Sequence, residues 1–136
     1  PTYSVSEKFF VNRALYKVSS PKRGDVIVFK TSASDSAALH IRRVIGLPGE
    51  TVQVKDGKIY INGKVYEENG AYQDMTDGGL ANSAITLESG EYFVLGDNRN
   101  NSEDSRFSDI GNISKKYIVG KVWFTVSPKN KIGFIK

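Results

Sequence analysis

Two dipeptides inside one alternating stretch constrain the fold of this chain most strongly. In TVQVKDGKIYINGKVY, residues 51–66, Asp56-Gly57 and Asn62-Gly63 are the pairs that two-residue hairpin turns favour, because both central residues adopt positive φ. With Asp56-Gly57 as the first turn, three pairs lie opposite each other: Lys55 and Lys58, Val54 and Ile59, and Val52 and Ile61. This register places the apolar residues of both strands on one face, and we predict an antiparallel meander with one buried side.

Further β segments are expected on both sides of the meander. DVIVFK, residues 25–30, joins four β-branched or aromatic residues, which is typical of a strand buried on both faces. The strand expected at 40–46 is halted by Leu47-Pro48-Gly49, since proline cannot donate to a ladder. Additional strands are predicted at 91–95, 119–126 and 132–135, a helical turn at 114–117, and a long loop at 67–83. The predicted fold class is mainly β, with antiparallel sheets and few helical turns.

Composition narrows the class of protein further. With 136 residues, of which 39% are hydrophobic and 25% charged, we expect a single folded domain over 1–136. The net charge is +4, but the 19 basic residues are scattered, so we expect no nucleic-acid partner. The chain has no cysteine, which excludes disulfides and a cysteine nucleophile, and no apolar run approaches the roughly 20 residues of a spanning helix. No motif predicts a cofactor or a metal site.

A series of short motifs carries a family resemblance. The strings are PT at 1–2, VN at 11–12, PKRGDVIVFK at 21–30, RRVIGLPGE at 42–50, DGKIYINGK at 56–64, YFVLGDNRNNSEDSR at 92–106 and IVGKVWF at 118–124. In this order and wording they resemble the bacterial type I signal peptidases, and the short chain is similar to the Gram-positive branch. Each string alone is common turn or strand material. The resemblance covers nearly the whole chain except 31–39 and 67–83.

The resemblance implies a fold, an activity and a location. The family cleaves signal peptides from exported proteins at the outer face of the cytoplasmic membrane, with a serine nucleophile and a lysine general base. A lysine can serve as a base because a desolvated amine can lose its proton. The family pattern puts the nucleophile three positions before Pro1, with Pro1 and Thr2 in the adjoining segment. We therefore expect the nucleophile and a membrane anchor upstream of this chain, and a protein at the extracellular face of the cell membrane.

The general-base position departs from the family pattern. The family lysine sits in Tyr-Ile-Lys-Arg-Val-Ile-Gly, and here Arg42 occupies its place. A guanidinium with a pKa above about 12 stays protonated, so Arg42 cannot take a proton from a serine. Instead we expect Arg42 to form a buried ion pair with Asp104 or another acid. Two alternatives keep a base: His40, two residues away on the same strand face, or a shifted alignment that recruits Lys30 or Lys55.

The loop LGDNRNNSEDSR, residues 95–106, resembles the wall of the family's active site. By position Ser102 is the partner of the missing lysine. The residues expected to shape or brace the site are Asp97, Asn98, Arg99, Asp104 and Arg106. Asn100 stands where the family usually has aspartate, which removes one charge. Paired charges also brace a non-regular loop in a protein without catalysis, so both a scaffold and a catalytic role remain open.

Two functions of different classes follow from the resemblance. The first is a protein that has lost its catalytic pair and serves as an accessory or chaperone-like factor, as degenerate relatives do in pilus gene clusters. Its partners would be exported or pilin polypeptides, bound as an extended strand. The second is an active membrane-bound serine endopeptidase. We also expect Phe9 and Phe10 to lie either in the core or against the membrane, and Trp123 in the sheet core.

Overall fold

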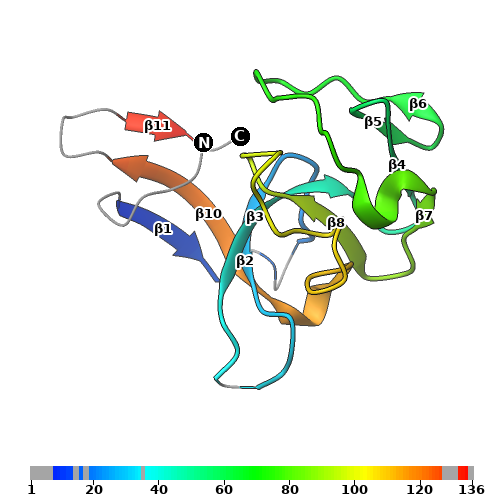
Figure 1. Ribbon diagram of the computed structural model, residues 1–136. Coiled ribbons are helices and arrows are strands. Elements are labelled where there is room, and N and C mark those ends of the chain that lie inside the picture. The colour runs from blue at the N-terminus through cyan, green and yellow to red at the C-terminus, as the bar shows by residue number, and fades with distance from the viewer. Residues whose placement is uncertain (1–7, 14–15, 17–18, 35, 127–131, 135–136) are drawn as a thin grey trace.

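The computed structural model describes residues 8–13, 16, 19–34, 36–126 and 132–134 (Figure 1). Strands dominate these residues. They are β1 (Lys8–Asn12), β2 (Val26–Phe29), β3 (His40–Gly46), β4 (Thr51–Lys55), β5 (Lys58–Ile61), β6 (Lys64–Val65), β7 (Ile85–Thr86), β8 (Glu91–Leu95), β9 (Ile113–Ser114), β10 (Ile118–Val126) and β11 (Ile132–Phe134). Two short 3-10 turns, η1 (Gly79–Asn82) and η2 (Lys115–Tyr117), are the helical elements of the described part. The prediction of a mainly β fold is confirmed.

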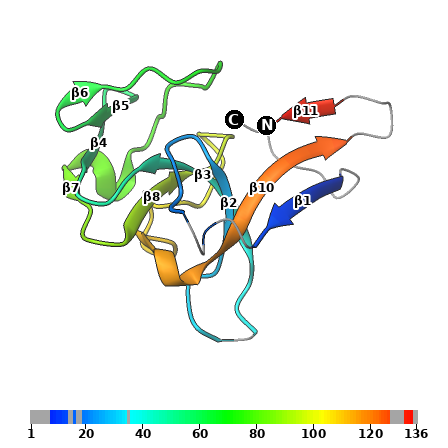
Figure 2. The same cartoon turned by 180° about the vertical axis from the view of Figure 1, so that it is seen from behind.

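The strands form two antiparallel sheets within the described residues. The larger sheet runs in the order β1-β10-β2-β3-β8-β9, and β11 pairs with β10. The smaller sheet runs in the order β6-β5-β4-β7. Both views show β3 and β8 between the smaller sheet and the end of the larger sheet that holds β1, β10 and β11 (Figures 1 and 2). β3 and β8 therefore form the centre of the molecule, which is where the loop after β8 begins.

The predicted meander is confirmed in its register. β4 pairs with β5 through Val52 and Ile61, Val54 and Ile59, and Lys55 and Lys58. At the first turn φ is 52° for Asp56 and 79° for Gly57, the positive values that the sequence predicts. Val52, Val54 and Ile59 are buried, while the lysine pair at the turn stays exposed.

The other predicted elements match closely, with two omissions. β3 and β8 have the predicted bounds, and every residue of β2 is buried. β10 begins one residue earlier than predicted, and β11 covers Ile132–Phe134, while the predicted last residue of that strand, 135, lies outside the described residues. β7 and β9 are not predicted, because two residues are too few for a periodic pattern. The region 67–83 is a loop that contains η1, and the helical turn predicted at 114–117 is η2.

Two apolar clusters lie on opposite faces of the central strands. One joins the two sheets, since Ile45 and Phe93 of the larger sheet pack with Val52 and Val54 of the smaller. The other covers the opposite face and includes Phe29, Val44 and Val94. Alternate residues of β3 and β8 thus enter different clusters, as the two-residue period of a strand requires. This packing fixes β3 and β8 from both sides.

Some expectations fall on residues whose side chains the structure does not describe. Phe9, Phe10 and Trp123 lie in β1 and β10, but their side chains are outside the described part. Pro1 and Thr2 are also outside it. Among the described residues, none of the helical segments has the length and apolar character needed to cross a lipid bilayer.

Candidate functional site

Arg42 lies on β3 at the point where its neighbour β8 ends. The register between these strands begins at Arg43 opposite Leu95, so Arg42, Ile41 and His40 lie beyond the end of β8. On the other side, β2 pairs with β3 as far as His40. The backbone N–H and C=O of Val44 form hydrogen bonds on the β2 side of β3. Because these groups alternate between the two sides along a strand, the N–H and C=O of Ile41 point to the opposite side, where β8 has already ended. Among the described residues, β3 therefore presents a short open edge beside Arg42.

The Arg42 guanidinium joins this edge to the loop after β8. Its Nε donates to the backbone oxygen of Glu103 at 2.7 Å, and its Nη1 donates to the backbone oxygen of Ile41 at 2.7 Å. Burial lowers the pKa of Arg42, while the carboxylates of Asp104 and Glu103 act to raise it. The ordinary pKa of arginine is so high that the side chain remains a cation at neutral pH. Arg42 thus supplies hydrogen-bond donors and a positive charge at this position.

The predicted ion pair of Arg42 with Asp104 or another acid of the loop is absent, since the hydrogen-bond partners of Arg42 among the described residues are backbone oxygens. Asp104 is fully buried and accepts from Arg106, through Nε at 2.9 Å and Nη2 at 2.9 Å. It also accepts from the backbone N–H of Gly96 at 3.0 Å and of Arg106 at 3.1 Å. These four bonds use both oxygens of the carboxylate, and Arg42 is left with carbonyl partners.

Asp97 braces the start of the loop against β3. Its two oxygens accept from Nε and Nη2 of Arg43, each at 2.8 Å. Arg43 also donates to the backbone oxygen of Gly24 at 3.0 Å. The pair is almost buried, with 10% of the Arg43 side chain and 8% of the Asp97 side chain exposed. Asp97 therefore joins the start of the loop to β3, and its partner Arg43 follows Arg42 directly.

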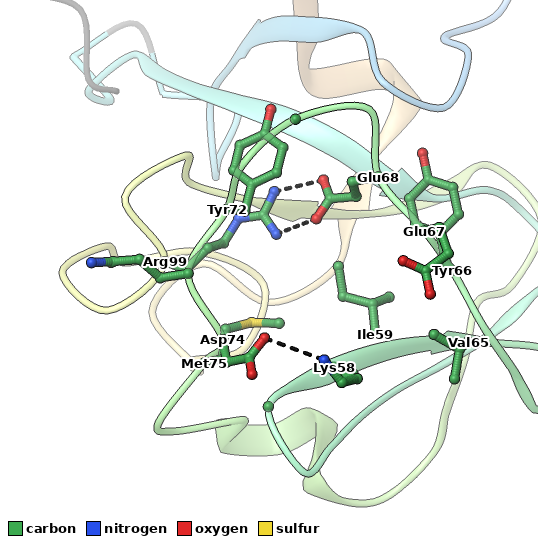
Figure 3. A pocket seen from close by; sticks show the side chains of 13 residues that line it. Lys58, Ile59, Val65, Tyr66, Glu67, Glu68, Tyr72, Asp74, Met75 and Arg99 are labelled. Carbon is green, nitrogen blue, oxygen red and sulfur yellow. Dashed lines mark hydrogen bonds and ion pairs between the residues drawn. The ribbon is translucent and has the colours of Figure 1, made fainter.

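Arg99 ties the same loop to the long loop at 67–83. Its guanidinium donates to both oxygens of Glu68, at 2.5 and 2.8 Å, and lies 4.1 Å from the centre of the Tyr72 ring. Figure 3 shows this pair and Tyr72 together in one pocket. Nε of Arg99 donates to the backbone oxygen of Gly96 at 2.8 Å. Arg99 is 1% exposed, so its charge depends on these partners.

Asn100, in place of the usual aspartate, fastens the two loops at a second point. Its Oδ1 accepts from the backbone N–H of Thr76 at 2.9 Å, and its Nδ2 donates to the backbone oxygen of Asp74 at 3.2 Å. An amide can do both because it has donors and an acceptor, whereas an ionised aspartate has acceptors alone. Asparagine in place of aspartate therefore adds the hydrogen bond from Nδ2 to the 67–83 loop.

Ser102 lies beside Arg42, over Gly96. A Cβ added to Gly96 would collide with the Ser102 side chain, so the absence of a side chain at Gly96 is what allows this approach. Together they line a cavity of about 190 Å³. Its lining residues are Val26, Ile41, Arg42, Arg43, Gly96, Asp97, Asn98, Asn101, Ser102 and Glu103. The structure thus brings together the residues expected at the general base and its partner, although no hydrogen bond joins Ser102 to Arg42 in the described part.

Asn98 is one of the residues that line the cavity. Its side chain is exposed, and its backbone oxygen accepts from the N–H of Asn101 at 3.1 Å, which closes a turn. His40 lies elsewhere: its ring stacks on Phe29, with centroids 5.6 Å apart, and it is absent from the cavity lining. Burial and the neighbouring Arg42 cation lower the pKa of His40, so the ring is neutral at pH 7.

Neither lysine considered as a replacement base lies at the cavity. Lys30 follows β2, where its backbone N–H donates to the oxygen of Tyr117 at 3.0 Å. Lys55 is exposed at the end of β4 in the smaller sheet. Neither is part of the lining, and among the described residues no group of acidic or histidine side chains is arranged to hold a metal ion.

Sequence reasoning missed two partners in this site. Arg43 and Glu68 form the pairs with Asp97 and Arg99, and neither is singled out by the motifs. The sequence holds a signal for Arg43, because it lies within a predicted strand next to Arg42. A cation buried in a strand needs an acidic partner. Glu68 has none, since it lies in the region without family resemblance.

Comparisons with known proteins agree on one family. A family model described as "Signal peptidase, peptidase S26" matches residues 1–127. "Signal peptidase I" of Leptolyngbya laminosa is 39% identical over 98% of this chain and 66% of its own length. "Signal peptidase I T" of Bacillus subtilis is 36% identical over 97% of this chain and 70% of its own. The chain therefore spans about two thirds of the length of these curated relatives.

A solved structure shows the same fold. The crystal structure of a signal peptidase I from Enterococcus faecalis is 33% identical in sequence, with a TM-score of 0.56. The similarity covers 74% of this chain and 95% of that one.

Proposed function

Because this chain belongs to the signal peptidase family, peptidase S26, we propose that it is a signal-peptidase-like protein that binds exported polypeptides without cleaving them. In this proposal it works at the extracellular face of the cell membrane, held there by an anchor outside the chain. It acts as an accessory or chaperone-like factor in the assembly of pili or other surface proteins.

The observation that supports this proposal is the state of Arg42. A general base needs a free lone pair, and a guanidinium has none at neutral pH. Two of its nitrogens donate to the backbone oxygens of Glu103 and Ile41, and these bonds hold the guanidinium at the position where the family has its general base. His40 is neutral, but it stacks on Phe29 outside the cavity lining.

The scaffold around this position supports binding. The carboxylates of Asp97 and Asp104 are fully engaged with arginines, which fixes the loop against β3 and leaves the cavity open. The open edge of β3 offers backbone groups on which an extended segment can lie as an added strand. Exported polypeptides, pilins among them, are the proposed occupants.

A second function is favoured by the neutral state of His40. A neutral imidazole can accept a proton, and His40 lies on the same strand face as Arg42. In this alternative the protein removes signal peptides as a serine endopeptidase. The nucleophile would come from the position three residues before Pro1, and a rearrangement would bring His40 to it.

A cleavage assay separates the two functions. The gene-encoded protein, with any residues that precede Pro1, is incubated with a preprotein that carries a small-x-small signal site. The Arg42→Lys and His40→Ala variants are run beside it. We expect no cleavage by the unmodified protein; cleavage that is lost in His40→Ala would overturn the accessory function. Cleavage by Arg42→Lys alone would show that the base is the missing part.

A further inference from the structure

We propose that the cavity beside Arg42 binds the terminal carboxylate of an extended polypeptide, an inference that rests on the proposed polypeptide-binding function and names the group recognised. The cavity, defined above by its ten lining residues, has a volume of about 190 Å³. That is room for a carboxylate and a small side chain. The proposal gives Arg42 a role of its own as the group that recognises the end of a chain.

The first support is a difference between Arg42 and its neighbours. Four other arginines of the described part each donate two bonds from the guanidinium to both oxygens of one carboxylate. They are Arg23 with Glu50, Arg43 with Asp97, Arg99 with Glu68, and Arg106 with Asp104. Arg42, half-buried and charged, has backbone oxygens in place of a carboxylate. The bidentate partner that the other four have is missing from the described residues around Arg42.

The second support is the set of donors left at the cavity. Nε and one hydrogen of Nη1 are used by Glu103 and Ile41, and no described residue accepts from Nη2. Nη2 and the second hydrogen of Nη1 can therefore donate to an incoming carboxylate. Ser102 Oγ makes no hydrogen bond to a described residue, and the Asn98 and Asn101 amides line the same cavity. Together these groups form a donor-rich lining suited to an anion.

Two acids line the cavity as well. Asp97 is already paired with Arg43 through both oxygens. Glu103 is exposed, and its carboxylate attracts Arg42 without an ion pair of bonding distance. An incoming carboxylate thus competes with the exposed Glu103 carboxylate for the Arg42 charge. Removal of the Glu103 charge is therefore expected to strengthen binding of the peptide.

The edge of β3 explains why the ligand is a chain end. The backbone oxygen of Ile41 on this edge already accepts from Nη1 of Arg42, which takes one of its two acceptor sites and holds the guanidinium beside the edge. A polypeptide that ends there places its carboxylate on the guanidinium, whereas a chain that continues must pass a partly buried cation.

Fluorescence anisotropy with labelled peptides tests the proposal. The peptides end in Ala-Ser-Ala as the free acid or as the amide, and a third, amidated peptide carries an internal aspartate to distinguish a side-chain acid from a chain end. Acetate is added as a competitor to represent a free carboxylate. We expect the acid to bind about tenfold more tightly than both amidated peptides, with acetate competing weakly.

Variants assign the preference to Arg42. Arg42→Gln is expected to bind acid and amide equally, and Glu103→Gln to bind the acid about two to three times more tightly. Lys55→Gln removes the same charge from a distant exposed position and should keep the preference. Equal binding of acid and amide by the unmodified protein, a preference that persists in Arg42→Gln, or binding of neither peptide would overturn the inference. Equal binding would still leave the polypeptide-binding function standing, and cleavage is measured separately.

Discussion

Asp104→Ala is expected to be the most damaging single substitution in the loop after β8. The carboxylate is fully buried, and its two oxygens accept from the Arg106 guanidinium and from the backbone N–H groups of Gly96 and Arg106. Its removal leaves the Arg106 cation, 1% exposed, with the backbone oxygen of Asp77 as its remaining hydrogen-bond acceptor among the described residues, beside the Phe107 ring. A buried charge cannot recover its hydration without opening the loop.

The size of the effect follows from this geometry. Breaking a buried ion pair by removing one partner costs about 3 to 5 kcal/mol. For a chain of this length that corresponds to a fall in the melting temperature of about 10 to 18 °C. Urea denaturation followed by far-ultraviolet circular dichroism gives the free energy of unfolding, and a thermal melt gives the second measure.

Glu103→Ala is the matched control, because Glu103 is the adjacent acid, its side chain is exposed, and its bond to Arg42 uses the backbone oxygen that alanine keeps. We expect a change within about 0.5 kcal/mol. The double substitution Asp104→Leu with Arg106→Met removes both charges and should recover part of the lost stability. If Asp104→Ala costs no more than Glu103→Ala, or if the double variant is less stable than Asp104→Ala, the reasoning from a stranded charge is refuted.

Three further predictions concern the same region. Gly96→Ala should lower the free energy of unfolding by about 1 to 3 kcal/mol in urea, because the added Cβ collides with Ser102. Tyr72→Leu should cost about 0.5 to 1 kcal/mol in a thermal melt through loss of the ring over Arg99, and Tyr72→Phe should cost less. The pKa of His40 is lowered in the folded state, so the unfolded state binds its proton more readily. Stability should therefore fall as the pH drops through the unfolded pKa near 6.5, and the urea midpoints of His40→Gln at pH 7.5 and 5.5 should differ less than those of the unmodified protein.

The local features of the fold are predictable from the sequence because they depend on neighbours in the chain. The register of β4 and β5 follows from Asp56-Gly57, since a two-residue turn leaves one pairing that keeps Val54 and Ile59 on the same face. β3 ends where Pro48 removes a donor. β7 escapes prediction because its pairing with β4 depends on tertiary contact rather than on a pattern of its own.

The partners of the site charges are harder to predict because they are distant in sequence. The motif places Arg99 and Asp97 in one loop, but each pairs outside it, with Glu68 and Arg43. The family resemblance places the loop that holds Asp104 beside Arg42, yet the oxygens of Asp104 are taken by Arg106 two residues away. The choice among several acids is decided by side-chain geometry, which a linear motif does not contain.

The position of β10 in the larger sheet also has a consequence for how the chain folds during synthesis. β10 lies between β1 and β2, and Val122 pairs with Val26 from the opposite end of the chain. β2 is a short, wholly apolar strand, so before β10 arrives it presents an unpaired edge of the kind that promotes aggregation. Closure of the sheet must wait for β10, and pairings of such long range make folding slow. An emerging chain therefore keeps this edge of β2 unpaired until β10 is available.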